Sequence, residues 1–103
     1  QVLVNGNYLY IVTRQGANTG TAGKLIRIPL NDFQRSAGSV ITTVKESNGI
    51  IALGDYLYIG NYSRDLPAIA QINIASFTQT SYVGLGGIGH GEGIVDIDGY
   101  IYI

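Results

Sequence analysis

Cysteine is absent from this 103-residue chain, so disulfide bonds and thiolate metal sites are excluded. Methionine is also absent, which leads us to expect a processed N-terminus or a segment of a longer chain. Only 13% of the residues are charged and the net charge is −1, which argues against nucleic acid as a partner because phosphate binding needs a basic face. No apolar run approaches the roughly 20 residues of a membrane-spanning helix, so we expect no membrane insertion.

The residues that are abundant favour β structure. The chain has 15 glycines and eight tyrosines, is rich in isoleucine, valine and threonine, and has only two prolines. Its 46% hydrophobic content and low charge argue against disorder. No segment shows sustained apolar spacing at the helical period. We therefore expect an all-β protein.

One short motif recurs three times along the chain. Tyr-Leu-Tyr-Ile occupies residues 8–11 and 56–59, and Tyr-Ile-Tyr-Ile occupies residues 100–103. A tight-turn sequence with Asn-Gly, Gly-Asp or Asp-Gly precedes each copy, and a hydrophobic segment precedes each turn. Asn-Gly and Asp-Gly supply the positive φ angles that two-residue hairpins require. The repeated unit is therefore strand, hairpin turn, strand.

The spacing of equivalent residues predicts a longer repeat. A separation of 44 residues recurs in the pairs Tyr56 and Tyr100, Ile28 and Ile72, Phe33 and Phe77, and Gly49 and Gly93. The pair Tyr8 and Tyr56 is 48 residues apart, so we place four extra residues in the stretch 15–23. Repeats of this length with four strands each are typical of β-propeller blades.

This register divides the chain into two and a half blades: blade one at 1–48, blade two at 49–92, and the start of blade three at 93–103. The expected strands are Val2–Val4, Tyr8–Thr13, Lys24–Ile28, Ser39–Val44, Ile50–Leu53, Tyr56–Gly60, Ala68–Ile74, one within Thr78–Leu85, Ile94–Ile97 and Tyr100–Ile103. In the second of these, Leu9 and Ile11 point one way and Tyr8 and Tyr10 the other. Both faces are apolar, so we expect the tyrosines to pack between sheets, and truncation of Tyr56 to open a core cavity.

The pattern YLYIGNYSRDLPAIAQINIASFT at 56–78, echoed by YLYIVTR…GKLIRIPLNDF, resembles the β-propeller repeat families. Such families include surface-layer and secreted bacterial proteins, receptor-binding parts of phage particles, and lyases or dehydrogenases with motifs of their own. The resemblance implies a β-propeller fragment. Closure needs at least four blades, so we expect the rest of a propeller chain, with a parent of roughly 300 residues.

The expected binding face is the rim formed by connections that vary between blades. These are the second-to-third-strand loops at 14–23 and 61–67 and the blade-to-blade loops at 45–49 and 84–93. Variable loops on a rigid frame commonly carry binding sites. The candidate ligand-binding residues on this rim are Arg14, Asn61, Tyr62, Arg64, Asp65, His90 and Glu92.

Tyr62, Arg64 and Asp65 have the chemistry of a sugar site, because aromatic stacking and planar hydrogen bonding suit carbohydrate. The alternative is a solvated loop with a local ion pair. His90 and Glu92 are too few ligands for a closed metal site, and the surrounding glycines do not form a dinucleotide motif, so we expect no metal and no cofactor. The serines lie in no recognisable nucleophile motif, so we expect no catalytic residues.

These observations predict a non-enzymatic recognition or scaffold module that binds a surface glycan or a protein partner. The expected location is extracellular, or on a cell or virion surface. Two alternatives stay open. One is a fragment of a propeller enzyme, a polysaccharide lyase or hydrolase, with its site over the central channel. The other is a structural component of a virion or surface fibre.

Overall fold

The computed structural model describes residues 1–13, 22–45, 47–61, 68–84, 95–97 and 99–102. This part of the chain is all-β apart from one 3-10 turn, η1 (Arg35–Ala37). The first sheet consists of β1 (Val2–Asn5), β2 (Tyr8–Thr13), β3 (Ala22–Pro29) and β4 (Ser39–Lys45). The second sheet consists of β5 (Ser47–Leu53), β6 (Tyr56–Asn61), β7 (Ala68–Asn73) and β8 (Thr78–Gly84). A hairpin of β9 (Val95–Ile97) and β10 (Tyr100–Tyr102) follows.

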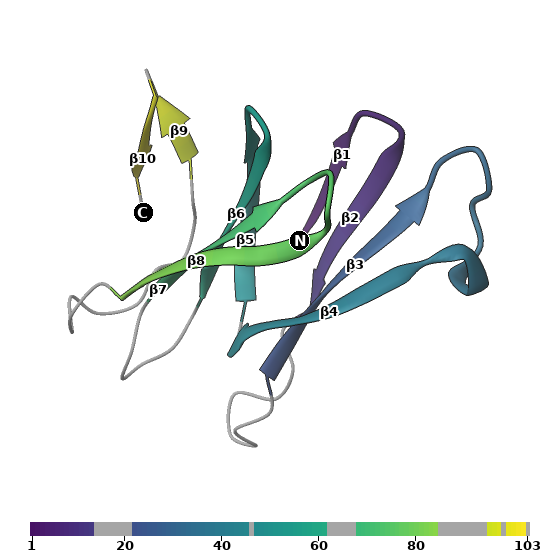
Figure 1. Ribbon diagram of the computed structural model, residues 1–103, viewed down its shortest axis with the longest axis horizontal. Helices are drawn as coiled ribbons and strands as arrows, with labels where there is room; N and C mark the ends of the chain where they lie inside the picture. Colours follow the sequence, from purple (N-terminus) through teal and green to yellow (C-terminus); the bar gives the residue numbers. More distant parts are fainter. Residues whose placement is uncertain (14–21, 46, 62–67, 85–94, 98, 103) are drawn as a thin grey trace.

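Each four-stranded sheet is an antiparallel meander in which strands adjacent in sequence are adjacent in space. The first sheet, the second sheet and the hairpin lie side by side in chain order (Figure 1). The all-β prediction is confirmed, and every expected strand is present with small differences at its ends. The sheets that the structure describes are open, and none closes on itself.

The three hairpin turns follow the predicted turn chemistry. Gly6, Gly54 and Gly99 have φ angles of 58°, 61° and 82°. A Cβ atom added at any of them would meet no other atom within 4 Å, so glycine is required by backbone conformation and not by crowding. The turns at β1–β2, β5–β6 and β9–β10 thereby set the register of the motif strands that follow them.

Residues at equivalent positions of the repeat form equivalent cross-strand pairs in the two sheets. Leu9 lies opposite Ile28 in the first sheet, and Leu57 lies opposite Ile72 in the second. The first residues of these pairs are 48 apart in sequence and the second residues are 44 apart, as the repeat predicts. In the fourth strands, Ser39 and Ser81 are equivalent but only 42 apart, because the β3–β4 connection is longer and contains η1.

The predicted blade-to-blade loop at 45–49 is wrong. Lys45 is the last residue of β4 and Ser47 is already the first of β5. Ser47 pairs with Asn61 and Gly49 with Gly60, and a bulge between Ser47 and Gly49 keeps the ladder in register. Lys45, Ser47 and Gly49 thus take part in backbone pairing, although composition alone assigned them to a loop.

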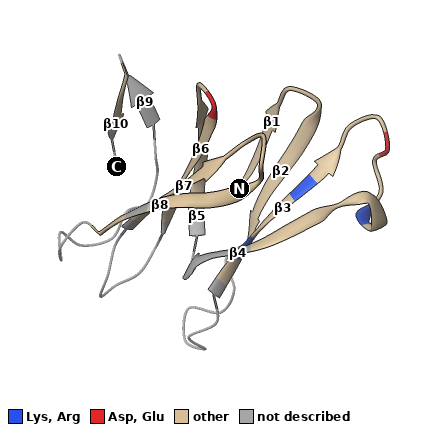
Figure 2. Cartoon of the chain, in the orientation of Figure 1, with Lys and Arg blue, Asp and Glu red and all other residues tan. Residues whose placement is uncertain are grey.

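The core lies between the two four-stranded sheets, where β2 and β1 contact β5, and β4 contacts β7. Its buried side chains are Tyr10, Val12 and Leu25 from the first sheet and Ile50, Leu57, Ile59, Ala70, Ile72 and Phe77 from the second. The charged residues that Figure 2 colours lie on β3, in the β3–β4 connection and at the β5–β6 turn. The packed faces are therefore held together mainly by apolar contact.

Candidate interaction faces

Strand alternation and register give each sheet two different faces. We call one the tyrosine face, which comprises Tyr8, Tyr10, Val12, Leu25, Arg27 and Ile41 in the first sheet and Tyr56, Tyr58, Ile69, Gln71 and Val83 in the second. We call the other the aliphatic face, which comprises Val2, Val4, Leu9, Ile11, Ile26, Ile28 and Val40 in the first sheet and Ile50, Ala52, Leu57, Ile59, Ala70 and Ile72 in the second.

The tyrosine face of the first sheet packs against the aliphatic face of the second. Leu57, Ile59 and Ile72 are completely inaccessible to solvent in this interface. Tyr10 is equally inaccessible on the opposing sheet. The opposite orientation of Leu9 and Tyr10 that strand alternation predicts is confirmed, and the tyrosines of the first sheet serve sheet-to-sheet packing.

Arg27 is held between aromatic rings from both sheets. Its guanidinium carbon lies 4.7 Å from the centre of the Tyr8 ring and 4.3 Å from that of Phe77. Its Nη1 also donates a hydrogen bond of 3.3 Å to the carbonyl of Ile74. Because Tyr8 belongs to the first sheet while Phe77 and Ile74 come from the β7–β8 turn, this cation–π clamp joins the two sheets.

Phe77 reaches the clamp through an unusual backbone conformation. It is the only non-glycine residue of the described chain with a positive φ, at 51°. Its ring is buried, and its centre lies 6.3 Å from that of Tyr10. Asn73 supports the turn, because its Oδ1 accepts hydrogen bonds from the backbone N–H and the hydroxyl of Ser76. A non-glycine residue in the left-handed region costs about 1 kcal/mol or more, which the buried ring offsets.

Tyr10 carries a buried hydroxyl that has no hydrogen-bond partner among the described residues. Burial raises the pKa of this phenol, and the nearby Arg27 guanidinium opposes part of the shift through its positive charge and its N–H groups, although none of these N–H groups reaches hydrogen-bonding geometry with the hydroxyl. The neutral phenol is therefore the form that folding favours. In the unfolded chain the phenol ionises near its ordinary pKa of 10.0, so stability is retained below that pH and falls as the pH rises toward the higher folded pKa.

Replacing Tyr10 with phenylalanine is expected to raise the free energy of unfolding by about 1 kcal/mol, because it removes an unpartnered buried hydroxyl and keeps the ring. The same change should also flatten the loss of stability above pH 10. Urea unfolding of both proteins between pH 8 and about pH 11 measures these effects. Tyr58→Phe is the matched control, because it removes the equivalent hydroxyl where that group is paired. If Tyr10→Phe and the parent lose the same unfolding free energy above pH 10, Tyr10 is not the source of the alkaline loss.

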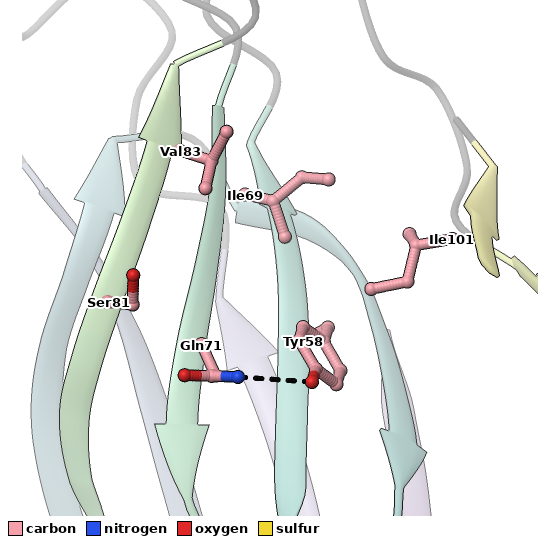
Figure 3. A pocket seen from close by; sticks show the side chains of 6 residues that line it. All are labelled: Tyr58, Ile69, Gln71, Ser81, Val83 and Ile101. Carbon is pink, nitrogen blue, oxygen red and sulfur yellow. Dashed lines mark hydrogen bonds between the residues drawn. The ribbon is translucent and has the colours of Figure 1, made fainter. Parts of the chain in front are cut away.

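The tyrosine face of the second sheet has a different polar group at its centre. Gln71 occupies the place of Arg27, opposite Tyr58, and its Nε2 donates a hydrogen bond of 3.1 Å to the Tyr58 hydroxyl. Thr80 Oγ1 donates to Gln71 Oε1 at 2.9 Å. A pocket of about 170 Å³ opens on this face, and Ile101 of β10 forms its far side (Figure 3). Its lining residues are Tyr58, Ile69, Gln71, Ser81, Val83 and Ile101.

This pocket suits the binding of apolar groups more than catalysis, because its lining is largely aliphatic and aromatic, with one amide from Gln71 and two hydroxyls from Tyr58 and Ser81. Across the residues that the structure describes, no group of three or more histidine or carboxylate side chains gathers as a metal site would require. In the same part of the chain, no helix is long and apolar enough to span a membrane.

Most of the sequence-predicted rim residues lie outside the described residues. This holds for Arg14, Tyr62, Arg64, Asp65, His90 and Glu92. Asn61 is described through its backbone as the last residue of β6, opposite Ser47.

Sequence reasoning missed the Arg27 clamp. The signal was available in the equivalence of Arg27 with Gln71 and of Phe33 with Phe77. The sequence does not show, however, which sheet covers which face, and this decides which aromatic ring lies against Arg27.

No family model matches the chain, and no curated protein or solved structure matches it significantly.

Proposed function

We propose that the chain is part of a β-propeller that works as a non-enzymatic recognition scaffold. The observation that carries the proposal is the repeated stacking order of the sheets. The aliphatic face of the second sheet covers the tyrosine face of the first, and Ile101, the equivalent of Leu57, lies over the tyrosine face of the second. Four-stranded meanders that stack in chain order through the same two faces are the building plan of a propeller.

The proposed binding rim follows from the direction of the strands. The short β1–β2 and β5–β6 turns lie at one end of their sheets. Because the strands are antiparallel, Thr13 and Ala22 lie at the opposite end of the first sheet, and Asn61 and Ala68 at the opposite end of the second. The connections that begin and end there differ in length and composition between the two sheets, which favours recognition at this rim.

The proposed ligand is a surface glycan or a protein partner, bound outside the cell or on a cell or virion surface. Tyr62 supplies a ring for stacking on a sugar, and Arg64 and Asp65 supply planar hydrogen-bonding groups. The low charge of the chain and its glycine-, threonine- and asparagine-rich connections suit such a surface role.

Replacing Tyr62 with alanine is expected to weaken glycan binding by roughly tenfold, which corresponds to about 1.4 kcal/mol. The free energy of unfolding should stay within about 0.5 kcal/mol of the parent, as for surface substitutions in general. A glycan array identifies the ligand, and titration calorimetry with thermal melts compares the proteins. Tyr100→Ala is the matched control, because Tyr100 is 70% exposed and belongs to β10, outside the proposed rim. Equal binding by the two variants would refute the role of Tyr62.

A further inference from the structure

A second pocket lies between the two four-stranded sheets, at the end opposite the proposed binding rim. The β1–β2, β5–β6 and β7–β8 turns lie at this end (Figure 1). The pocket among them has a volume of about 420 Å³, and both sheets contribute to its lining, which consists of Asn5, Gly54, Asp55, Asn73, Ile74 and Ala75. We call it the turn pocket. Its volume falls at the lower end of the range of about 300–1,000 Å³ that small-molecule sites occupy.

Hydrogen bonds fix one wall of the turn pocket. The N–H of Ile74 donates to the carbonyl of Asp55 at 3.0 Å, which ties the β7–β8 turn to the β5–β6 turn. The carbonyl of Ile74 accepts the 3.3 Å hydrogen bond from Arg27 of the first sheet. Ile74 is therefore held from both sheets. A wall that is fixed in advance lowers the conformational entropy that is lost when a ligand binds.

Three polar side chains line the turn pocket: the amides of Asn5 and Asn73 and the carboxylate of Asp55. The Oδ1 atom of Asn73 already accepts hydrogen bonds of 2.9 and 3.1 Å from the backbone N–H and the hydroxyl of Ser76, so this amide has its N–H groups to offer. An ionised carboxylate only accepts hydrogen bonds, and an amide can donate and accept. Donors and acceptors in one pocket match hydroxyl groups, which also do both.

The repeat does not require polar residues at these places. Asn5 is the last residue of β1, and its equivalent at the end of β5 is Leu53. Asp55 directly precedes the Tyr-Leu-Tyr-Ile motif, and its equivalent before the third copy of the motif is Gly99. The same hairpin thus forms with leucine and with glycine at these positions. The polar groups of the turn pocket are therefore a property of this one pocket.

The chemistry of the turn pocket favours an uncharged, hydroxyl-rich ligand. Calcium takes about six to eight oxygen ligands, whereas this lining has one carboxylate and the Oδ1 atom of Asn73 is already occupied. An anion is disfavoured because Asp55, the one charged residue of the lining, is negative. A sugar ring carries neighbouring hydroxyl groups and no charge, and it satisfies both conditions.

We propose that the turn pocket binds a single uncharged sugar residue through its hydroxyl groups. The carboxylate of Asp55 accepts a hydrogen bond from one hydroxyl, and the amides of Asn5 and Asn73 bind neighbouring ones. Ile74 and Ala75 form the aliphatic part of the lining, against the C–H groups of the ring. This site lies beyond the proposed function, because it uses other residues at the other end of the sheets.

The test is an NMR titration of the 103-residue chain with the methyl glycosides of glucose, galactose, mannose and N-acetylglucosamine. At least one glycoside should shift the backbone amide signals of Gly54, Ile74 and Ala75, because these residues line the pocket. The size of the shift against sugar concentration gives the affinity. The dispersion of the amide signals also shows that each variant is folded.

Two substitutions remove polar groups from the pocket and keep the hairpins. Asp55→Asn and Asn5→Leu install the residues that the chain itself carries at equivalent positions, Asn7 and Leu53. Each should weaken sugar binding at least about tenfold, because a hydrogen bond to the sugar is weakened or lost. Asp32→Asn is the matched control, since Asp32 is an exposed carboxylate in the β3–β4 connection, and it should leave the affinity unchanged.

The proposal is overturned if none of the four glycosides shifts these three signals up to its solubility limit. It is also overturned if Asp55→Asn binds as tightly as the parent, or if calcium chloride shifts the signals and the glycosides do not. Tyr62→Ala, which tests the proposed rim, should leave the shifts unchanged. Failure of the rim and failure of the turn pocket are therefore separate results.

Discussion

Replacing Phe77 with alanine is expected to lower the free energy of unfolding by about 3–5 kcal/mol. The ring is buried between the two sheets, where it contacts Tyr10 and the guanidinium of Arg27. Its removal opens a cavity and leaves Arg27 with one aromatic neighbour, Tyr8, in place of two. Alanine also keeps the cost of the left-handed backbone at this position without the burial that offsets it. The loss would be a large part of the 5–15 kcal/mol that is typical of a domain.

Phe33→Ala is the control for this measurement, because the two phenylalanines occupy equivalent positions of the repeat and the chemical change is identical. Phe33 is 64% exposed, so its truncation should change the free energy of unfolding by no more than about 0.5 kcal/mol. Both variants are unfolded in urea at the same protein concentration. Equal losses in the two would mean that Phe77 does not join the sheets in solution.

Replacing Leu57 with alanine is expected to lower the free energy of unfolding by about 2–5 kcal/mol. Leu57 is fully buried near the start of β6, opposite Ile72 on one side and Ala52 on the other. Ile72 is itself fully buried, so the surroundings have little freedom to collapse into the space. Most of the lost stability therefore reflects a cavity between the two sheets.

Leu30→Ala provides the same chemical change at a residue that is 43% exposed in the β3–β4 connection. Its expected effect is within about 0.5 kcal/mol. Urea unfolding at fixed pH measures both variants, and the slope of unfolding free energy against urea shows whether the transition remains two-state. A loss for Leu57→Ala no larger than that for Leu30→Ala would contradict the stacking of the two sheets.

The sequence led us to expect a core cavity on truncation of Tyr56, and this stays a prediction. Tyr56 is half-buried, whereas its neighbour Leu57 is fully buried. Strand alternation puts Tyr56 and Leu57 on opposite faces of the sheet. Because both faces are apolar, the sequence does not tell which of the two residues is more deeply buried. The ranking comes from the covering sheets: four strands cover the face of Leu57, and only the β9–β10 hairpin covers the face of Tyr56.

The predicted rim residues and the residues at the interface between the two sheets come from different parts of the chain. The rim was chosen by variation among connections, and those of its residues that lie outside the described part of the chain remain predictions. The interface residues were hidden from sequence reasoning for another reason. Arg27 reads as an ordinary exposed charge on a strand until Phe77, 50 residues further on, is seen to lie against it.

The amino-acid sequence alone determined the local structure of this protein. Glycine at three positive-φ turns and the alternation of the Tyr-Leu-Tyr-Ile motif set the hairpins β1–β2, β5–β6 and β9–β10 and their pairing, because hairpin register depends on residues that are close in sequence. Only the tertiary structure decided which face is buried, which tyrosine loses its hydroxyl partner and which arginine is clamped. These properties depend on the order in which whole sheets stack, and contacts between residues far apart in sequence determine that order.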